Sequence, residues 1–426
     1  MVESVKEREI LNTKSEIRNK FKIQNSKPIK LSEVKHIEKG RLKSGYEEFD
    51  RVVGGGIVPG SATLLSGDPG IGKSTLLLHI ISKIGGLYIS GEESAEQVKL
   101  RAKRLGIKGE NIVIMPETDV DVIIKSIKQE DSMTIRPKTG SYSNASFKVL
   151  SSYNLVVIDS VQTLSSGELA GMPGSVGQVR YCAERLTQLA KNLGIPVVII
   201  GHVTKEGTIA GPKVLEHMVD TVLYLEGERF AQARILRTLK NRFGAIEEVG
   251  IFEMKDSGLI QIDNPSAVFL KDRVKNVPGS AVTVVMEGTR PLLVEIQALV
   301  VPSQLAIPRR IANGIDFNRL QLIGAILTKR LNMPLGSFDI FINVSGGLRI
   351  TEPSADLAVA IAIISSFKNK AIEANTAIFG ELGLLGEIRS PNASERRIKE
   401  AKRLGFKTII AQPQVKNLKQ ASTLLG

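Results

Sequence analysis

Residues 67–75 read Gly67-Asp68-Pro69-Gly70-Ile71-Gly72-Lys73-Ser74-Thr75 and fit the phosphate-binding pattern G-x-x-x-x-G-K-[ST]. Apolar runs at 62–65 and 76–81 flank the stretch, as the strand–loop–helix context of such a loop requires. The glycines allow successive backbone N–H groups to point inward at the start of a helix, which makes a nest for anions. We expect Lys73 to contact the β- and γ-phosphates of a nucleoside triphosphate and Ser74 to hold Mg²⁺. A glycine-rich turn that matches by chance is the alternative.

Length and composition indicate a globular protein of two or three domains. The chain has 426 residues, of which 42% are hydrophobic and 24% charged. We find no signal peptide and no uncharged apolar run of about 18 residues that could cross a membrane. The single cysteine, Cys182, excludes an intramolecular disulfide and a Cys-based zinc site within this chain. These features predict a cytoplasmic protein without zinc, whereas ATP and Mg²⁺ are expected from the phosphate loop.

Positive charge is concentrated in two segments. The net charge is +13, residues 1–43 contain twelve Lys or Arg against six Glu, and residues 389–419 contain nine against two. Because contacts between such cations and phosphates drive non-specific binding of nucleic acids, the distribution favours a polyanionic partner. A basic surface that is merely solvated is the alternative on charge alone.

The order of apolar runs and turns predicts an α/β fold built on a doubly wound, mainly parallel sheet, with ligands at the carboxyl ends of its strands. After the phosphate loop, strands are expected at residues 86–90, 111–115, 153–160 and 195–202. Residues 231–262 look antiparallel, with a hairpin turn at 241–244.

Three segments follow from these patterns. Residues 1–40 are predicted to be a basic arm, residues 41–264 the nucleotide-binding domain, and residues 265–426 a second α/β domain. The linker is placed at Asp263-Asn264-Pro265-Ser266. The polar, Ser-rich residues 131–152 are expected to form an exposed insertion. In the second domain we expect strands near 283–286 and 292–299, and helices near 317–331, 355–367 and 394–404.

Acidic residues follow two of the predicted core strands. Asp159 ends an apolar strand that we expect beside the phosphate-loop strand, where its carboxylate can hold the hydration shell of Mg²⁺. A helix-capping aspartate is the alternative. Glu92 and Glu93 end the preceding strand, and Glu92, the first after the strand, is our choice for the acid that orients the attacking water. An exposed pair of carboxylates with no catalytic role is the alternative.

Other candidates lie at strand ends and turns. His202 ends the fourth core strand and can sense the γ-phosphate, or it is a hydrogen-bonded histidine with no such role. The Gly-rich loops 165–177 and 203–213 are candidates for contacting a ligand in a central channel, or plain connectors. Lys240 and Arg242 flank a hairpin turn, which in a ring-forming ATPase can reach the γ-phosphate of a neighbouring subunit, whereas most basic turns are only solvated.

Together these motifs resemble the bacterial RadA (Sms) family of DNA-repair ATPases, a branch of the RecA superfamily. The resemblance rests on residues 67–75, Gly91-Glu92-Glu93-Ser94, the Asp159 strand, residues 201–207 and the signature Lys240-Asn241-Arg242-Phe243-Gly244. It runs from about residue 40 to the C-terminus, and the second domain resembles the proteolytic domain of Lon. The resemblance implies a hexameric, DNA-dependent ATPase akin in fold to the helicase DnaB, which drives branch migration on single-stranded and branched DNA, with the recombinase RecA as a candidate partner. It also supports Lys73, Glu92, Asp159, Lys240 and Arg242 as catalytic residues.

The sequence departs from the family in two places. The family usually begins with a four-cysteine zinc ribbon that this chain does not have, and residues 131–152 are longer than usual. Three rival functions are weighed: an ATP-dependent Lon-like protease, a RecA-type strand-exchange filament and an ATP-gated scaffold. The basic second domain favours a closed ring over a filament.

Ser354 matches the position of the Lon nucleophile. A serine needs a base to accept its proton, which in Lon is a lysine, and the equivalent position here falls at Glu395, a much weaker base. Asp356 adds charge where an oxyanion would sit. We therefore predict that Ser354 caps the helix that follows and that the chain is no protease.

Basic side chains that could contact DNA are predicted on the C-terminal helix and on the loop after the Asp159 strand. They are Arg396, Arg397, Lys399, Lys402 and Arg403 on the helix and Arg180 on the loop.

Overall fold

The computed structural model describes residues 30, 32, 40–133, 153–202, 212–227, 233–262 and 264–424, with the backbone alone for 129–133. Residues 1–40 and 41–426 form two units, and every element below belongs to the second. Nearly all of the predicted arm lies outside the described residues. The predicted insertion at residues 131–152 also does, apart from residues 131–133, which end a helix.

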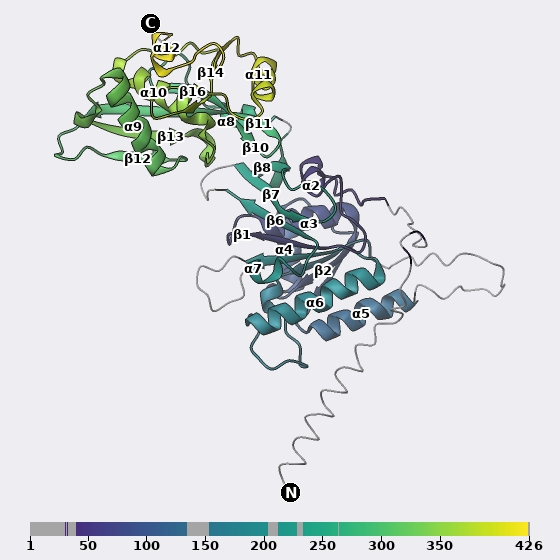
Figure 1. The fold of residues 1–426 in the computed structure, drawn as a ribbon. Helices are drawn as coiled ribbons and strands as arrows, with labels where there is room; N and C mark the ends of the chain where they lie inside the picture. The colour runs from purple at the N-terminus through teal and green to yellow at the C-terminus, as the bar shows by residue number, and fades with distance from the viewer. Residues whose placement is uncertain are drawn as a thin grey trace. The chain divides into compact units, whose positions relative to one another are not determined.

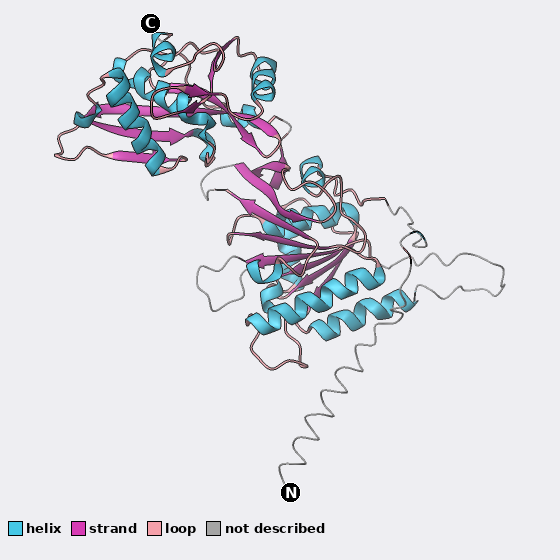
Figure 2. Ribbon diagram, viewed as in Figure 1, coloured by secondary structure: helices cyan, strands magenta, loops and turns pink. Residues whose placement is uncertain are grey.

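Residues 41–262, the N-terminal half, are built around a nine-stranded sheet (Figures 1 and 2). The strand order is β3-β2-β4-β5-β1-β6-β7-β8-β9. The first six strands are parallel to one another: β1 (Ala62–Gly67), β2 (Gly86–Ser90), β3 (Ile112–Pro116), β4 (Val156–Asp159), β5 (Val197–His202) and β6 (Thr221–Glu226). Three antiparallel strands extend the sheet: β7 (Ala233–Asn241), β8 (Val249–Lys255) and β9 (Gly258–Gln261). The doubly wound sheet with an antiparallel extension is thus confirmed.

Helices cover both faces of this sheet. Buried strand residues alternate between two cores: Leu64 of β1 and Ile199 of β5 belong to one, and their neighbours Leu65 and Ile200 to the other. This alternation is the two-residue period of a strand buried on both faces. The first core includes residues of helices α5 (Val120–Met133) and α6 (Val176–Leu193). The second core includes residues of α2 (Glu47–Val52), α3 (Lys73–Ile84) and α4 (Ala95–Arg104). The short helix α7 (Pro212–Leu215) and the 3₁₀ turn η2 (Val161–Thr163) complete this half.

The prediction that the strand ending at Asp159 lies beside the phosphate-loop strand is wrong. Strand β4, which ends at Asp159, pairs with β2 and β5, whereas β1 pairs with β5 and β6. Strand β5 lies between them, an order that burial alone does not decide, because β1, β4 and β5 are all buried along nearly their whole length. Asp159 still lies at the same carboxyl edge of the sheet as Gly67, since β1, β4 and β5 run parallel.

Residues 264–424, the C-terminal half, contain a six-stranded sheet in the order β12-β13-β11-β10-β14-β17. The strands are β10 (Ser280–Glu287), β11 (Arg290–Pro302), β12 (Arg310–Asn313), β13 (Phe338–Val344), β14 (Thr376–Ile378) and β17 (Thr408–Ile410), with a separate pair β15 (Glu381–Leu382) and β16 (Ile388–Arg389). The helices are α8 (Pro265–Phe269), α9 (Phe317–Leu331), α10 (Asp356–Lys368), α11 (Ser394–Arg403) and α12 (Leu418–Thr423), with 3₁₀ turns η3 (Leu335–Ser337), η4 (Ser345–Gly347) and η5 (Pro353–Ala355).

The junction of the two halves is packed and is no open linker. Pro265 and Ser266 are buried in α8, and the Ser266 hydroxyl accepts a hydrogen bond from the N–H of Leu293. Ile235 of β7 and Ile251 of β8 belong to the same hydrophobic core as α9 and α10. The linker prediction is therefore wrong at residues 265–266, and the domain boundary after residue 264 stays a prediction. No helix in the described part of the chain is both long and apolar enough to span a bilayer.

Candidate active site

The phosphate-binding loop lies between β1 and α3, as predicted from its sequence. Gly67, Gly70 and Gly72 all have positive φ, and Gly72 is the N-cap of α3. A Cβ on Gly67 would lie 2.3 Å from the carbonyl oxygen of Leu225, so only glycine fits at the point where the loop leaves the sheet. The loop thus presents backbone N–H groups at the N-terminus of a twelve-residue helix, a donor set that fits phosphate.

Lys73, the first residue of α3, is 3% exposed. Its ammonium donates hydrogen bonds to the carbonyl oxygens of Gly67 (2.8 Å) and Asp68 (2.9 Å), so it lies within the loop. Burial lowers the pKa of Lys73 to about 8, although the negative charges of Asp159, Asp68 and Glu92 oppose that shift. The cation therefore lies where loop-bound phosphates would contact it, with the acidic candidates near enough to act on its charge.

Asp159 is fixed by two side chains that sequence reasoning missed. The hydroxyl of Tyr88 donates to Asp159 Oδ2 at 2.5 Å, and Arg101 Nη2 lies 3.7 Å from the same oxygen. Tyr88 is in β2, directly beside β4, and Arg101 is on α4. A tyrosine inside an apolar strand was the available signal, because a buried hydroxyl needs a polar partner. A hard carboxylate ligand at this edge fits Mg²⁺, with Ser74 and Asp159 as the residues that would hold the ion and its waters.

The two glutamates after β2 have different surroundings. Glu92 Oε1 accepts a hydrogen bond from Ser160 Oγ at 2.6 Å and lies 3.6 Å from His202 Nε2. Glu93 instead forms an ion pair with Arg101 at 2.7 Å. Burial, and then the positive charge of Lys73, lower the pKa of His202, which favours the neutral imidazole, while Glu92 and Asp159 oppose that shift. Of the two glutamates, Glu92 is the one whose carboxylate is not tied to a cation.

Lys240 and Arg242 lie at the opposite edge of the sheet from their own phosphate loop. Strand register pairs Lys240 with Val222, and Val222 with Leu64, the third residue of β1, which is three residues, or about 10 Å, before Gly67. The Lys240 ammonium donates to the carbonyl oxygens of Glu216 (2.7 Å) and Val219 (2.8 Å), near the start of β6.

Arg242 follows β7 in the predicted hairpin connection and is exposed. Its Nη1 lies 3.1 Å from Asp220 Oδ1, a buried carboxylate at the same edge as Val219. Both cations therefore lie on the amino side of the parallel strands, away from the carboxyl edge where their own chain binds phosphate.

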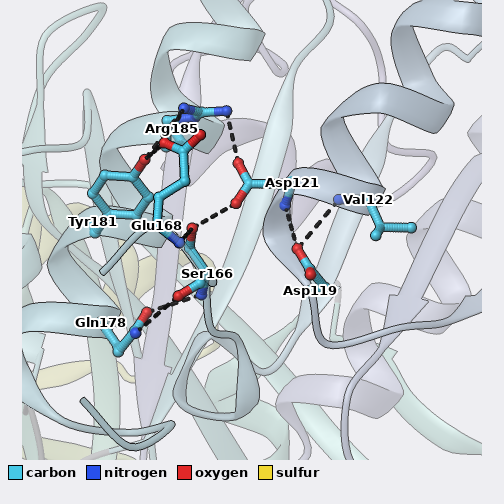
Figure 3. A network of polar contacts seen from close by, with 8 residues as sticks. All are labelled: Asp119, Asp121, Val122, Ser166, Glu168, Gln178, Tyr181 and Arg185. Carbon is cyan, nitrogen blue, oxygen red and sulfur yellow. Dashed lines mark hydrogen bonds and ion pairs between the residues drawn. The ribbon is translucent and has the colours of Figure 1, made fainter. Parts of the chain in front are cut away.

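The loop between η2 and α6 is held by a polar network (Figure 3). The buried amide of Gln178 donates to the carbonyl oxygens of Ser166 (3.1 Å) and Leu169 (2.6 Å) and accepts from the Ser166 N–H. Ser166 Oγ donates to Asp121 of α5, which also forms an ion pair with Arg185 at 2.8 Å. Loop 165–177 is thus a shaped loop, whereas of loop 203–213 only Pro212 and Lys213 are described.

Two predicted DNA contacts need correction. Arg180 lies on helix α6 and not on a loop, although its side chain is exposed. Arg397 is 1% exposed: its guanidinium forms an ion pair with Glu352 at 2.7 Å and donates to the carbonyl oxygen of Val284. It therefore has no surface to offer DNA. The other basic residues of α11 are exposed, namely Arg396, Lys399, Lys402 and Arg403.

Ser354 does not cap α10. It lies inside η5, the N-cap position belongs to Ala355, and no side chain caps the helix. Ser354 Oγ accepts a hydrogen bond from Arg397 Nη1 at 3.0 Å, whereas Glu395, expected at the site of a base, is exposed. Since a guanidinium cannot lose its proton in a protein, the group beside this serine cannot act as its base.

Asp356 is buried and forms a two-pronged ion pair with Arg319. Burial raises the pKa of Asp356, and its bonds to Arg319 oppose that shift. The loop after Ser354 is therefore filled by a salt bridge within the C-terminal half.

The topology and the phosphate loop define a RecA-like P-loop ATPase core followed by a Lon-protease-like α/β unit. A family model of the KaiC ATPase matches residues 42–266, and a model of the ChlI subunit of Mg-chelatase matches residues 312–414. The chain is 49% identical to the DNA repair protein RadA of Streptococcus pneumoniae, over 91% of this chain and 88% of that protein. It is 48% identical to RadA of Bacillus subtilis, over 90% and 80% of the two chains. This chain belongs to the RadA family of DNA repair proteins.

Solved structures that are similar to part of this chain include a KaiC-like protein from Pyrococcus horikoshii OT3 and the RadB recombinase. The first is 19% identical with a TM-score of 0.40, covering 52% of this chain and 99% of the other. The second is 22% identical with a TM-score of 0.37, covering 52% and 100%.

Proposed function

We propose that this protein is a DNA-dependent ATPase that works as a hexameric ring and drives branch migration of recombination intermediates. The observation that carries the proposal is the separation of Lys73 from Lys240 and Arg242 across the sheet. Cations so far from their own phosphate loop cannot complete their own site, but a neighbour in a ring can supply them. A finger that acts in trans of this kind is a common way to stabilise phosphoryl transfer.

Residue roles follow from the contacts at the carboxyl edge. The bound Mg–ATP would supply the reacting phosphoanhydride. Lys73 would neutralise charge on the β- and γ-phosphates, while Asp159, held by Tyr88, would hold the Mg²⁺ through its waters. The Ser160 hydroxyl holds Glu92 Oε1, which leaves the second carboxylate oxygen to orient a water for in-line attack.

DNA as the ligand is supported by charge and by the family. The exposed cations of α11 and Arg180 are suited to phosphate contacts, which bind nucleic acids without regard to sequence. The relatives' names describe DNA repair proteins. We extend that role to single-stranded and branched DNA in the cytoplasm, with RecA as the candidate partner protein. The buried Arg397 beside Ser354 argues against the rival reading of an active protease.

The test is ATP turnover with and without single-stranded DNA, with mass measured by light scattering on a sizing column. A motor shows turnover that DNA stimulates, in the same fractions as a six-subunit species. Turnover that DNA leaves unchanged would reject the motor in favour of an ATP-gated scaffold. Degradation of casein by the same fractions would revive the protease reading.

A further inference from the structure

The turn between β10 and β11 fits closely against the hairpin that carries Lys240 and Arg242. The two-residue turn is Gly288-Thr289, closed by the pair Glu287 and Arg290. The N–H of Thr289 donates to the carbonyl oxygen of Glu247 at 3.0 Å, and its hydroxyl donates to Glu248 Oε1 at 2.7 Å. A Cβ on Gly288 would lie 1.5 Å from the Glu247 oxygen, so no larger residue fits there.

Two ion pairs flank this turn and tie it to the N-terminal half. Arg290 Nη1 lies 2.6 Å from Glu48 Oε2, and Glu48 is 4% exposed and also accepts the N–H of Ile251 in β8. On the other side, Glu287 Oε2 lies 2.5 Å from Arg237 Nη1. Burial raises the pKa of Glu287, and the charge of Arg237 opposes that shift. Removing either arginine would leave a buried carboxylate without its partner, which is strongly destabilising.

These contacts fix the segment from which the two trans cations project. Arg237 is on β7, three residues before Lys240, and Glu247 and Glu248 close the connection that Arg242 opens. Near the start of that connection, Arg41 Nη2 donates to the carbonyl oxygen of Phe243 at 2.6 Å. The hairpin is therefore held at three places, two of which belong to the β10–β11 turn.

We infer that residues 287–290 are positioning residues for ATP hydrolysis: through Arg237, Glu247 and Glu48 they set where Lys240 and Arg242 stand at the subunit boundary. The C-terminal half then has a direct part in the rate of hydrolysis without touching nucleotide. The inference rests on the proposed role of the two cations in trans, and it adds the group that aims them.

The decisive variants are Arg290→Met and Arg290→Lys in the full-length protein. The control is Arg319→Met, which breaks an ion pair with the buried carboxylate of Asp356 inside the C-terminal half. Arg290→Met is expected to lower kcat about tenfold while KM and ATP affinity stay within about twofold, since the nucleotide's own loop is untouched. Arg290→Lys keeps the charge and should recover most of the turnover. Arg319→Met should lower the melting temperature and leave kcat unchanged.

Unchanged kcat in a folded Arg290→Met protein overturns the inference, and so does an equal loss of kcat in Arg319→Met. If Arg290→Met does not fold, Thr289→Val replaces it: this variant removes one hydroxyl bond to Glu248, and unchanged kcat there overturns the inference too. Lys240→Ala is measured in the same series. Full turnover in Lys240→Ala rejects the proposed trans role itself, whereas an inactive Lys240→Ala beside a fully active Arg290→Met rejects the positioning role alone.

Discussion

At the scale of single residues, Lys73 shows how burial prepares a charge for a ligand. Its ammonium is nearly enclosed and bonded to two carbonyl oxygens of the loop, and desolvation brings its pKa to about 8. An ordinary lysine stays charged to a much higher pH. The residue is therefore close to giving up its proton when no anion is near.

Lys73→Ala should abolish ATP hydrolysis and leave the fold intact, because the side chain contributes phosphate contacts and no apolar packing. Lys83→Ala, at the other end of α3, is the matched control and should keep full turnover. Steady-state hydrolysis and a melting curve measure both. Wild-type turnover in Lys73→Ala would mean that ATP is hydrolysed elsewhere.

ATP affinity should weaken above about pH 8. Lys73 is protonated below its pKa of about 8, and the charged form is the one that binds phosphate, so binding at higher pH must take up a proton. The dissociation constant then rises by up to about tenfold per pH unit. Calorimetry at pH 8.5 in buffers of different ionisation enthalpy should detect the uptake. A dissociation constant that is flat from pH 7 to 9.5 would contradict it.

At the scale of elements, the strands could be predicted from sequence and their order could not. The apolar runs at 62–65 and 86–90 locate β1 and β2 because a buried strand must be apolar on both faces. The sequence of residues 156–159 does not predict that β5 will lie between β4 and β1, since strand order is set by long-range packing. For the same reason the partners of Asp159, which come from β2 and α4, were missed.

The hairpin and the glutamate of two different subunits should complement each other. Lys240→Ala and Glu92→Gln should each nearly abolish turnover, because each removes one side of a shared site. Mixed in equal amounts, they should recover roughly a quarter of the wild-type rate if subunits mix at random, since a fraction of interfaces pairs an intact Glu92 with an intact Lys240. Measuring ATPase over a series of mixing ratios tests this. If no ratio recovers activity, the two residues do not act across subunits.

At the scale of the whole molecule, one helix divides its cations between surface and core. Arg397 and Ala401, one turn apart, form the buried side of α11, while Arg396, Lys399 and Lys402 are exposed. The four-residue spacing was visible in the sequence. The partner Glu352 lies 45 residues earlier in the chain, so the sequence alone could not show that an arginine would be buried.

DNA affinity should fall steeply with salt, and the exposed face of α11 should account for part of that slope. Reversing Arg396, Lys399 and Lys402 to Glu should weaken binding of single-stranded DNA by at least about tenfold and flatten the salt dependence. Fluorescence anisotropy at several salt concentrations measures both. Unchanged affinity would exclude this face as a DNA contact.

Arg397→Met should affect stability and leave DNA binding unchanged, unlike the reversal of the exposed cations. It leaves Glu352 unpaired and is expected to lower the free energy of unfolding by about 3 kcal/mol. DNA affinity per folded molecule should stay as in the wild type. Chemical denaturation gives the first quantity and anisotropy the second. Wild-type stability in this variant would show that the ion pair contributes nothing to the fold.

The contact between Arg397 and Ser354 also limits the substitutions by which this site could become a peptidase. Exchanging the arginine for lysine would bring an amine near the hydroxyl, but Glu352 would hold that amine in its charged form, in which it accepts no proton. A second change, at Glu352, would be needed before the first had any catalytic effect, and each alone would weaken the packing around residue 397. A descendant of this protein would therefore have to pass through less stable forms before this site could gain peptidase activity.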